Sequence, residues 1–292
     1  APFRWACRQS RIGPRVTPRQ PPPAGDSRNL TLRVLAGVVL APLTIAAAYF
    51  GGWLWAVLAT LATVGMYAEW LTVVQAIRPR VAAAGIAALV LAGLALAVGF
   101  PGKALLAIAV GLLGIVLLAQ INRLWALAGL LYAAAALFGA VLVRADPQSG
   151  FVALLFVLLI VWITDIGGYF AGRGIGGPKL WVRVSPKKTW AGAIGGFVGS
   201  LAVAAGFAAS GFGRMLPLLL LGAVLSVASQ LGDLLESAVK RRFGVKDSSN
   251  IIPGHGGLLD RLDGFVAAIV IAAAIGVLRG GLDGAGRGLM IW

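Results

Sequence analysis

Apolar runs of roughly 18–23 residues recur along this chain, and each is long enough for one helix to cross a bilayer. Only 12% of the residues are charged, which is about half the fraction found in soluble domains. The fold class is therefore expected to be all-α, a polytopic transmembrane helical protein. The run lengths predict about nine spans, at residues 32–50, 53–75, 81–99, 104–121, 125–143, 151–172, 190–210, 215–237 and 260–278.

The chain divides by composition into four parts. Residues 1–30 are rich in Arg, Pro and Gln and are expected to be a disordered basic tail. Residues 31–149 are expected to form N-terminal membrane helices with few acidic residues. Polar residues enter the spans over 150–279, so a catalytic membrane region is expected there, followed by a C-terminal tail at 280–292.

The net charge of +15 fits a membrane protein, and no nucleic-acid partner is expected. Lys and Arg concentrate in the N-terminal segment and in alternate connections between spans, above all 173–189 and 238–259. Basic connections usually face the cytoplasm. The N-terminus and these two loops are therefore predicted to be cytoplasmic, as in a multi-pass protein of a bacterial-type inner membrane. The single cysteine, Cys7, excludes an intrachain disulfide.

Carboxylates inside predicted spans are the first candidates for a functional site, because they are costly in a membrane and usually face a polar cavity. Six of the ten acidic residues lie within or at the ends of spans: Glu69, Asp165, Asp233, Glu236, Asp260 and Asp263. If the last two spans pack together, Asp233, Asp260 and Asp263 can converge on a hard cation such as Mg²⁺. The alternative is that these carboxylates pair with Arg and Lys at helix ends, and for Glu69 the alternative is a cytoplasmic Arg.

Both long loops carry features that suit a nucleotide triphosphate. The loop after the eighth span offers Lys240, Arg241 and Lys246, a Gly-rich turn that includes Gly256 and Gly257, and the only histidine, His255. Backbone N–H groups in such a turn can approach an anion that basic side chains neutralise.

The other loop ends in Ser185, Lys187, Lys188 and Thr189, directly before the seventh span, where a helix N-terminus also favours a phosphate. The alternative is that this loop contacts only lipid headgroups. Within the sixth span, Asp165, Gly168 and Gly172 share a face, and close helix packing is the simplest interpretation of the two glycines.

Residues 237–263 resemble the signature of the phosphatidate cytidylyltransferase family. That signature combines Ser, Lys-Arg, Lys-Asp, His-Gly-Gly and Asp-Arg-apolar-Asp at fixed or short spacings, and it is filled by Ser237, Lys240, Arg241, Lys246, Asp247, His255, Gly256, Gly257, Asp260, Arg261 and Asp263. The fragments DIGGYFAGR at 165–173, SPKKT at 185–189 and GDLLES at 232–237 also look like the family. Ala191 departs from it, since many members have a polar or acidic residue there.

The resemblance implies transfer of a cytidylyl group from CTP to phosphatidate, giving CDP-diacylglycerol and pyrophosphate, with Mg²⁺ as cofactor and room for a second cation. The implied catalytic residues are Asp233, Lys240, Arg241, Asp260 and Asp263, of which Asp233 and Asp263 first, and Asp260 second, would hold the metal. The implied substrate-binding residues are Ser185, Lys187, Lys188, Thr189, Lys246, His255, Gly256, Gly257 and Arg261.

The expected partners are CTP from the cytosol, phosphatidic acid from the inner leaflet and membrane lipids, and a homodimer is left open. Two other functions compete with this interpretation. One is a CTP-dependent polyprenol or dolichol-type lipid kinase, which would transfer a phosphate instead of a cytidylyl group. The other is a transporter with an intramembrane carboxylate relay, although no inverted repeat is evident.

Overall fold

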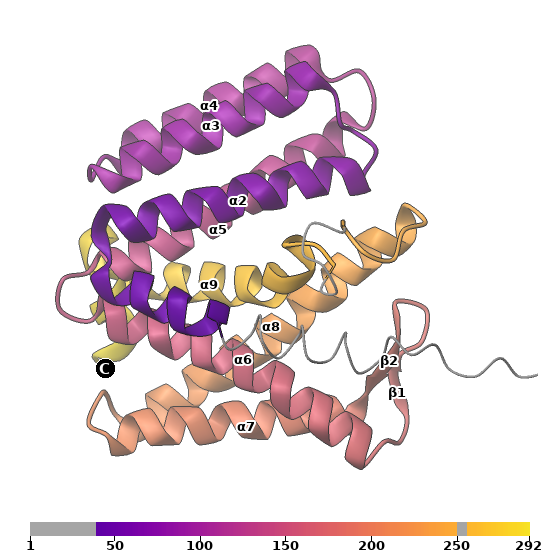
Figure 1. The fold of residues 1–292 in the computed structure, drawn as a ribbon. Coiled ribbons are helices and arrows are strands. Elements are labelled where there is room, and N and C mark those ends of the chain that lie inside the picture. Colours follow the sequence, from indigo (N-terminus) through magenta and orange to yellow (C-terminus); the bar gives the residue numbers. More distant parts are fainter. Residues whose placement is uncertain (1–38, 250–255) are drawn as a thin grey trace, which may run out of the picture.

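The computed structural model describes residues 39–249 and 256–292, which form a bundle of long helices (Figure 1). Within these residues, eight helices are long and apolar enough to cross a membrane. They are α2 Gly52–Val73, α3 Pro79–Ala97, α4 Pro101–Leu118, α5 Arg123–Ala145, α6 Gly150–Gly174, α7 Trp190–Ala209, α8 Met215–Arg242 and α9 Leu259–Gly280. The expectation of an all-α membrane protein is confirmed, and a shorter apolar helix, Val39–Phe50, covers the described part of the first predicted span.

Three stretches differ from the prediction. Helix α8 continues to Arg242 instead of ending near residue 237, so part of the expected loop is helical. The loop between α6 and α7 holds a small antiparallel hairpin, β1 Lys179–Trp181 and β2 Ser185–Thr189. The expected C-terminal tail forms a 3-10 helix, η1 Leu282–Gly284, and helix α10 Ala285–Met290, which packs on α9.

Several helix boundaries follow from local chemistry. Pro79 and Pro101 occupy the first turns of α3 and α4, where a missing N–H costs nothing. The predicted break before α2 lies at Gly51, whose φ of 62° lies in the left-handed region. The Thr189 side chain accepts a hydrogen bond of 3.1 Å from the Gly192 amide and so caps α7.

The helices pack in a spatial order that differs from the chain order, and this order joins the two halves of the sequence. Helices α4, α3, α2 and α5 pack one on the next, then α5 packs on α9, α9 on α8, α8 on α7, and α7 on α6 (Figure 1). The last long helix, α9, therefore lies between the N-terminal helices and the rest of the C-terminal region. Because of this arrangement, the N-terminal helices α2 and α5 contact α9.

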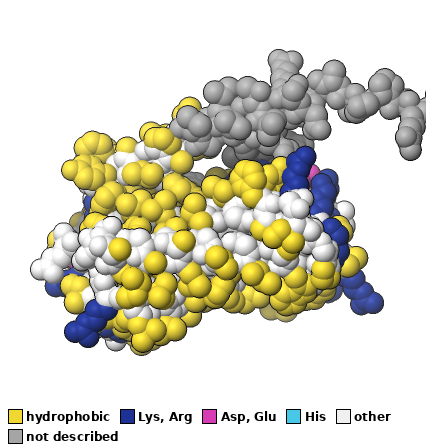
Figure 2. Space-filling view, turned by 90° about the horizontal axis from the view of Figure 1, so that it is seen from below, with side chains coloured by type: hydrophobic (Ala, Val, Ile, Leu, Met, Phe, Trp, Pro, Cys, Tyr) yellow, Lys and Arg dark blue, Asp and Glu magenta, His cyan; other side chains and the backbone are white. Residues whose placement is uncertain are grey.

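The ends of the bundle differ in charge. The C-terminal ends of α6 and α8, the N-terminal ends of α7 and α9, and the β hairpin lie at one end of the molecule (Figure 1). Figure 2 shows apolar side chains over most of one face, with Lys and Arg side chains gathered mainly at the end that carries the hairpin. The described candidate residues of both long loops therefore lie at the same end of the bundle, which is rich in Lys and Arg (Figure 1 and Figure 2).

The opposite end is fixed by Asp146, a buried carboxylate in the turn between α5 and α6. Burial alone would raise its pKa. Hydrogen bonds from the amides of Arg287, Ser149 and Gln148, together with one from the Arg287 side chain, outweigh burial and hold the pKa of Asp146 below its usual value. The carboxylate therefore ties α10 to the α5–α6 turn in its charged form.

Candidate active site

Helices α8 and α9 approach closely at two glycines, and this approach places their carboxylates together. A Cβ on Gly232 would lie 2.6 Å from the Asp263 carbonyl oxygen, and a Cβ on Gly264 would lie 2.5 Å from the Ser229 hydroxyl oxygen. Only glycine allows the backbones to come this near. As a result, Asp233 of α8 and Asp263 of α9 face the same cavity.

That cavity has a volume of about 740 Å³ and lies at the basic end of the bundle. Residues from α6, the hairpin, α7, α8 and α9 line it: Thr164, Asp165, Gly168, Tyr169, Gly172, Arg173, Leu180, Lys187, Lys188, Thr189, Gly192, Ala193, Gln230, Asp233, Lys240, Asp260, Arg261 and Asp263. Cationic and anionic side chains therefore share one space that is large enough for a nucleotide. Asp165 is among them, so a carboxylate of α6 shares the cavity with Asp233 and Asp263.

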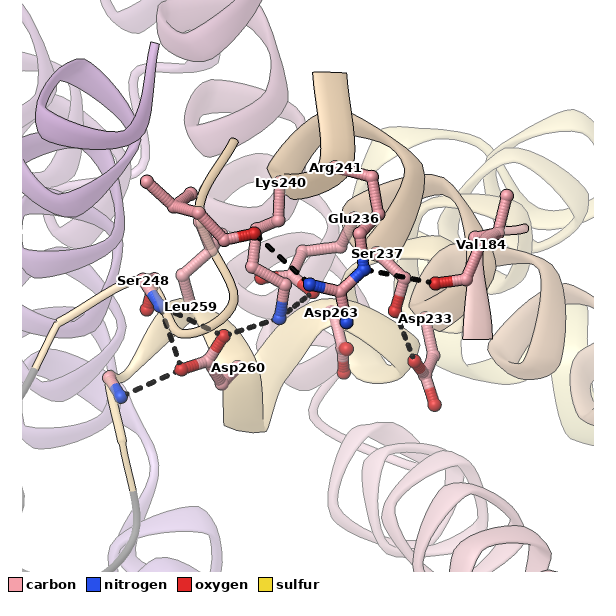
Figure 3. A network of polar contacts seen from close by, with 12 residues as sticks. Val184, Asp233, Glu236, Ser237, Lys240, Arg241, Ser248, Leu259, Asp260 and Asp263 are labelled. Carbon is pink, nitrogen blue, oxygen red and sulfur yellow. Dashed lines mark hydrogen bonds and ion pairs between the residues drawn. The ribbon is translucent and has the colours of Figure 1, made fainter. Parts of the chain in front are cut away.

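Lys240 lies between two carboxylates (Figure 3). Its Nζ is 2.6 Å from Glu236 Oε2, one turn earlier on α8, and 2.6 Å from Asp260 Oδ1 on α9. All three side chains are largely buried. From the sequence, these carboxylates could either bind a metal ion or pair with a basic group at a helix end. Glu236 and Asp260 do the second, since both pair with Lys240.

A second ion pair crosses the cavity between the hairpin and α8. Lys188 Nζ contacts Asp233 Oδ2, and both side chains remain 30% exposed. The Ser237 hydroxyl lies 3.4 Å from the other Asp233 oxygen (Figure 3). Because this pair is open to solvent, an incoming anion or cation can compete for either partner.

The hairpin itself is attached to the end of α8. Arg241 Nε donates to the Val184 carbonyl oxygen at 3.4 Å, and its Nη1 donates to the Val245 carbonyl oxygen at 3.3 Å (Figure 3). The contact with Val184 links the hairpin that carries Lys187 and Lys188 to the end of α8, and the contact with Val245 stays within the segment after α8. Lys187 is exposed, while Thr189 is buried as the cap of α7.

The Gly-rich turn contacts Asp260. Gly256 has a φ of 79°, and a Cβ there would lie 2.7 Å from Asp260 Oδ2. Through this turn the Gly257 amide donates to Asp260 Oδ2 at 2.9 Å, and the Ser248 amide donates to the same oxygen at 3.1 Å. Asp260 is thus held by two amides and Lys240, and the Gly257 N–H is engaged by protein in this conformation.

The structure brings together many of the residues predicted from the sequence. Of these, Lys187, Lys188, Thr189, Asp233, Lys240, Asp260, Arg261 and Asp263 line the cavity. Ser185 and Arg241 lie beside it on β2 and α8, and Lys246 lies in the exposed connection after α8. His255 falls outside the described residues.

Asp165, Arg173 and Gln230 also line the cavity, and none of them was given a catalytic, substrate-binding or metal-binding role from the sequence. Asp165 had a sequence signal, since it is a carboxylate in an apolar run next to glycines. Gln230 had none, because one amide on a helix is common at packing interfaces. Its place in the site depends on the packing of α7 on α8, which brings Gln230 Nε2 to 3.3 Å from the Ala193 carbonyl oxygen.

Carboxylates of the cavity have the chemistry that a hard cation such as Mg²⁺ prefers. Among the described residues, no three His, Cys, Asp or Glu side chains are gathered closely enough to hold a metal ion by themselves. Mg²⁺ commonly takes only one or two carboxylates and fills its other positions with water and substrate phosphate oxygens. Asp233 and Asp263 face the same cavity and supply hard oxygen ligands of this kind.

Comparison with known proteins gives the family. A model described as "Cytidylyltransferase family" matches residues 31–278, which include every residue of the cavity. The chain belongs to the cytidylyltransferase family. The match also covers all of the described N-terminal helices, which by sequence pattern alone could be identified only as membrane spans.

Individual members of the cytidylyltransferase family agree over most or part of the chain. A protein named phosphatidate cytidylyltransferase from Brucella suis is 40% identical over 258 residues, covering 86% of this chain and 94% of the relative. Proteins of the same name from Bacillus subtilis and Haemophilus influenzae are 46% and 45% identical over 129 and 130 residues, covering 42% of this chain and 47% and 45% of the relatives.

Proposed function

We propose that this protein transfers the cytidylyl group of CTP to phosphatidate, forming CDP-diacylglycerol and pyrophosphate. The observation that carries the proposal is the cavity at the basic end, where Asp233 and Asp263 face Lys187, Lys188 and Arg261. These residues belong to the motifs that resemble phosphatidate cytidylyltransferases. The names of the relatives from Brucella suis and Bacillus subtilis support the same reaction.

The reaction requires positioning and charge neutralisation more than acid–base chemistry. A phosphate oxygen of phosphatidate attacks the α-phosphorus of CTP and forms the new P–O bond. The bond from the α-phosphorus to the oxygen that bridges to the β-phosphate breaks, and its electron pair leaves with pyrophosphate. The nucleophile is already an anion, so the protein has to hold two polyanions in line and offset their repulsion.

The basic side chains around the cavity would perform that task. Lys187 is exposed and faces the cavity without an acidic partner among the described contacts, so its ammonium can meet a phosphate of CTP. Lys188 would move from Asp233 to the nucleotide, because the ion pair is partly open to solvent and a triphosphate carries more negative charge than one carboxylate. Arg173 and Arg261 line the same cavity and would add positive charge for the phosphate of phosphatidate.

A magnesium ion would fit between Asp233 and Asp263, with substrate oxygens as further ligands. When bound there, it would supply positive charge to the leaving pyrophosphate. Asp260 remains a weaker candidate ligand, since Lys240 and two amides already use its oxygens. A second cation would have Asp165 as an additional carboxylate in the same cavity.

The location of the cavity supports access for both substrates. It lies at the end with the most basic loops, which the positive-inside rule places in the cytoplasm, so CTP would arrive from the cytosol. Part of its wall is α6, whose Tyr169 side chain is 56% exposed. Phosphatidate would enter along this side from the inner leaflet of a bacterial-type inner membrane. A homodimer is compatible with this geometry and is not required by it.

Purified protein in detergent, supplied with Mg²⁺, phosphatidate and CTP, tests the reaction. Radiolabel in the α-phosphate of CTP should appear in lipid, and pyrophosphate should be released in equal amount. A CTP-dependent lipid kinase would instead transfer label from the γ-phosphate to a prenol or dolichol. Lipid labelled only from the γ-position would therefore reject the cytidylyltransferase assignment.

A further inference from the structure

Glu69, a buried carboxylate on α2, contacts the beginning of α9 and the loop before it. Its side chain lies in the N-terminal half of the chain and is 2% exposed. Oε1 accepts hydrogen bonds from the Leu258 amide at 2.9 Å and the Ser249 hydroxyl at 2.7 Å. Oε2 accepts from the Leu259 amide at 2.7 Å and the Ser248 hydroxyl at 2.9 Å.

Two of these donors are backbone groups that α9 cannot satisfy itself. The first amides of a helix have no intrahelical partner, and a nearby negative charge also interacts favourably with the helix dipole. Leu258 and Leu259 stand at the N-terminus of α9, and the Leu258 side chain cannot cap it. Glu69 therefore caps α9 from another helix, in the place where Ser, Asp or Asn usually does so locally.

The other two donors come from the opposite end of the loop. Ser248 and Ser249 follow α8, so one carboxylate holds both the segment that leaves α8 and the segment that enters α9. The turn is close enough that a Cβ on Gly257 would overlap both Ser248 Oγ and Glu69 Oε2. Glycine therefore suits position 257, because the Ser248 hydroxyl and the Glu69 carboxylate occupy the space that a side chain would need.

The contacts extend to the cavity through Asp260. The Ser248 amide and the Gly257 amide both donate to Asp260 Oδ2, while Lys240 binds Oδ1. Asp263 follows one turn later on the same helix. Glu69 itself is not among the residues that line the cavity, so its influence on bound substrate must pass through the loop and the first turn of α9.

We propose that Glu69 is a positioning residue for cytidylyl transfer, which ties residues 248–249 after α8 to the N-terminus of α9 and fixes that N-terminus. The proposal rests on the proposed function for its catalytic consequence. From the sequence, Glu69 could have paired with a cytoplasmic arginine. In the described residues it accepts hydrogen bonds from two hydroxyls and two amides instead. All four groups donate to the carboxylate, which suits an ionised side chain that has only acceptor atoms.

Glu69→Gln is the sharpest variant, because it preserves size but replaces one acceptor oxygen with a donor NH₂ group. That group would face either the Leu258 or the Leu259 amide, and two donors cannot bond. Turnover should fall by about ten- to a hundredfold, as expected when catalytic groups shift by about an ångström. Glu69→Asp keeps the charge on a shorter side chain and should recover part of the lost turnover.

Hydrogen exchange separates a positioning role from a general loss of stability. In Glu69→Gln, peptides covering residues 256–263 should exchange faster, while peptides from the middle of α5 and α9 stay as in the wild type. Thr63→Val is the matched control, since Thr63 is a buried polar residue of the same helix that bonds only within α2. It should leave turnover and exchange at 256–263 unchanged.

The outcomes are distinct. Glu69→Gln protein that turns over and exchanges like the wild type overturns the proposal. So does a loss of activity that follows only the fraction of unfolded protein, or one that leaves exchange at 256–263 unchanged. If the wild-type protein makes no CDP-diacylglycerol, the proposed function fails, yet faster exchange in Glu69→Gln would still establish that Glu69 holds the loop.

Discussion

Lys240 and Asp260 join α8 to α9 through an ion pair of 2.6 Å between Nζ and Oδ1, in a place where only 11% and 12% of the two side chains are exposed. Glu236 lies equally close to the same ammonium. A lysine between two carboxylates in a largely buried position stabilises the helix pair, because without the lysine both carboxylates would keep an uncompensated charge.

Lys240→Met should therefore destabilise the protein by roughly 3–5 kcal/mol, the usual effect of breaking a buried ion pair. Thermal unfolding in detergent measures this. Adding Glu236→Gln to the same chain removes one of the two unpaired charges and should recover part of the loss. If Lys240→Met unfolds like the wild type but binds CTP poorly, the lysine serves the nucleotide and not the helix pair.

Lys187→Ala should behave in the opposite way. Lys187 is exposed on β2 and faces the cavity, so its removal should leave the unfolding temperature unchanged. Loss of a charge-assisted contact of roughly 1.5–3 kcal/mol should lower kcat/KM for CTP by about ten- to a hundredfold. Steady-state kinetics with varied CTP give the answer, and wild-type values would assign this strand to lipid headgroups or topology.

Asp263→Asn should abolish activity and leave the protein folded. The substitution keeps the shape of the side chain and removes one negative charge from a cavity that has to balance two polyanions against a cation. Turnover across a Mg²⁺ titration is the measurement, with thermal unfolding as control. Wild-type Mg²⁺ dependence in Asp263→Asn would refute the metal assignment.

Asp260→Asn should also lower activity, but together with a loss of stability, because Asp260 accepts hydrogen bonds from the Ser248 and Gly257 amides.

The basic end should face the cytoplasm. Single cysteines at Asp247, exposed in the loop after α8, and at Gln148, exposed in the turn between α5 and α6, report on opposite ends of the bundle. In intact cells whose protein lacks Cys7, an impermeant thiol reagent should label the Gln148→Cys variant and spare Asp247→Cys. The reverse pattern would invert the topology and remove the cytosolic route for CTP.

Gly196→Ala should destabilise the pair of helices α6 and α7, whereas Gly206→Ala on the same helix should not. A Cβ on Gly196 would overlap the Thr164 carbonyl oxygen of α6, and one on Gly206 would meet nothing within 4 Å. Backbone cannot move aside easily, so overpacking should cost about 1–3 kcal/mol in the first variant. Equal unfolding temperatures for both variants would show that the helices can separate without penalty.

Much of the membrane fold could be predicted from run length, because a bilayer requires about 20 apolar residues for each span. The end of α8 could not, since its last turn is polar and continues beyond the apolar run. The hairpin was also missed: β1 and β2 have three and five residues, too few for a periodic pattern.

The candidate site was predictable where rare residues carried the signal. Asp233 and Asp263 stood out as carboxylates in apolar helices, and the structure places them in one cavity. The partner of Lys240 was not predictable, because its choice between a phosphate and Asp260 depends on how α8 crosses α9. For Glu69 the donors lie 179 to 190 residues away in the chain, a separation that no local pattern can bridge.

The length of α8 has a consequence for the lipid substrate. Its 28 residues extend for about 42 Å at 1.5 Å per residue, against a hydrocarbon core of about 30 Å. If the helix begins at the far boundary, Asp233 lies about 27 Å along it, close to the level at which headgroups of the near leaflet begin. The phosphate of a lipid in the near leaflet then lies at the same depth as the cavity. The acyl chains can therefore stay in the leaflet during the reaction, and their length does not change the depth at which the lipid phosphate reacts.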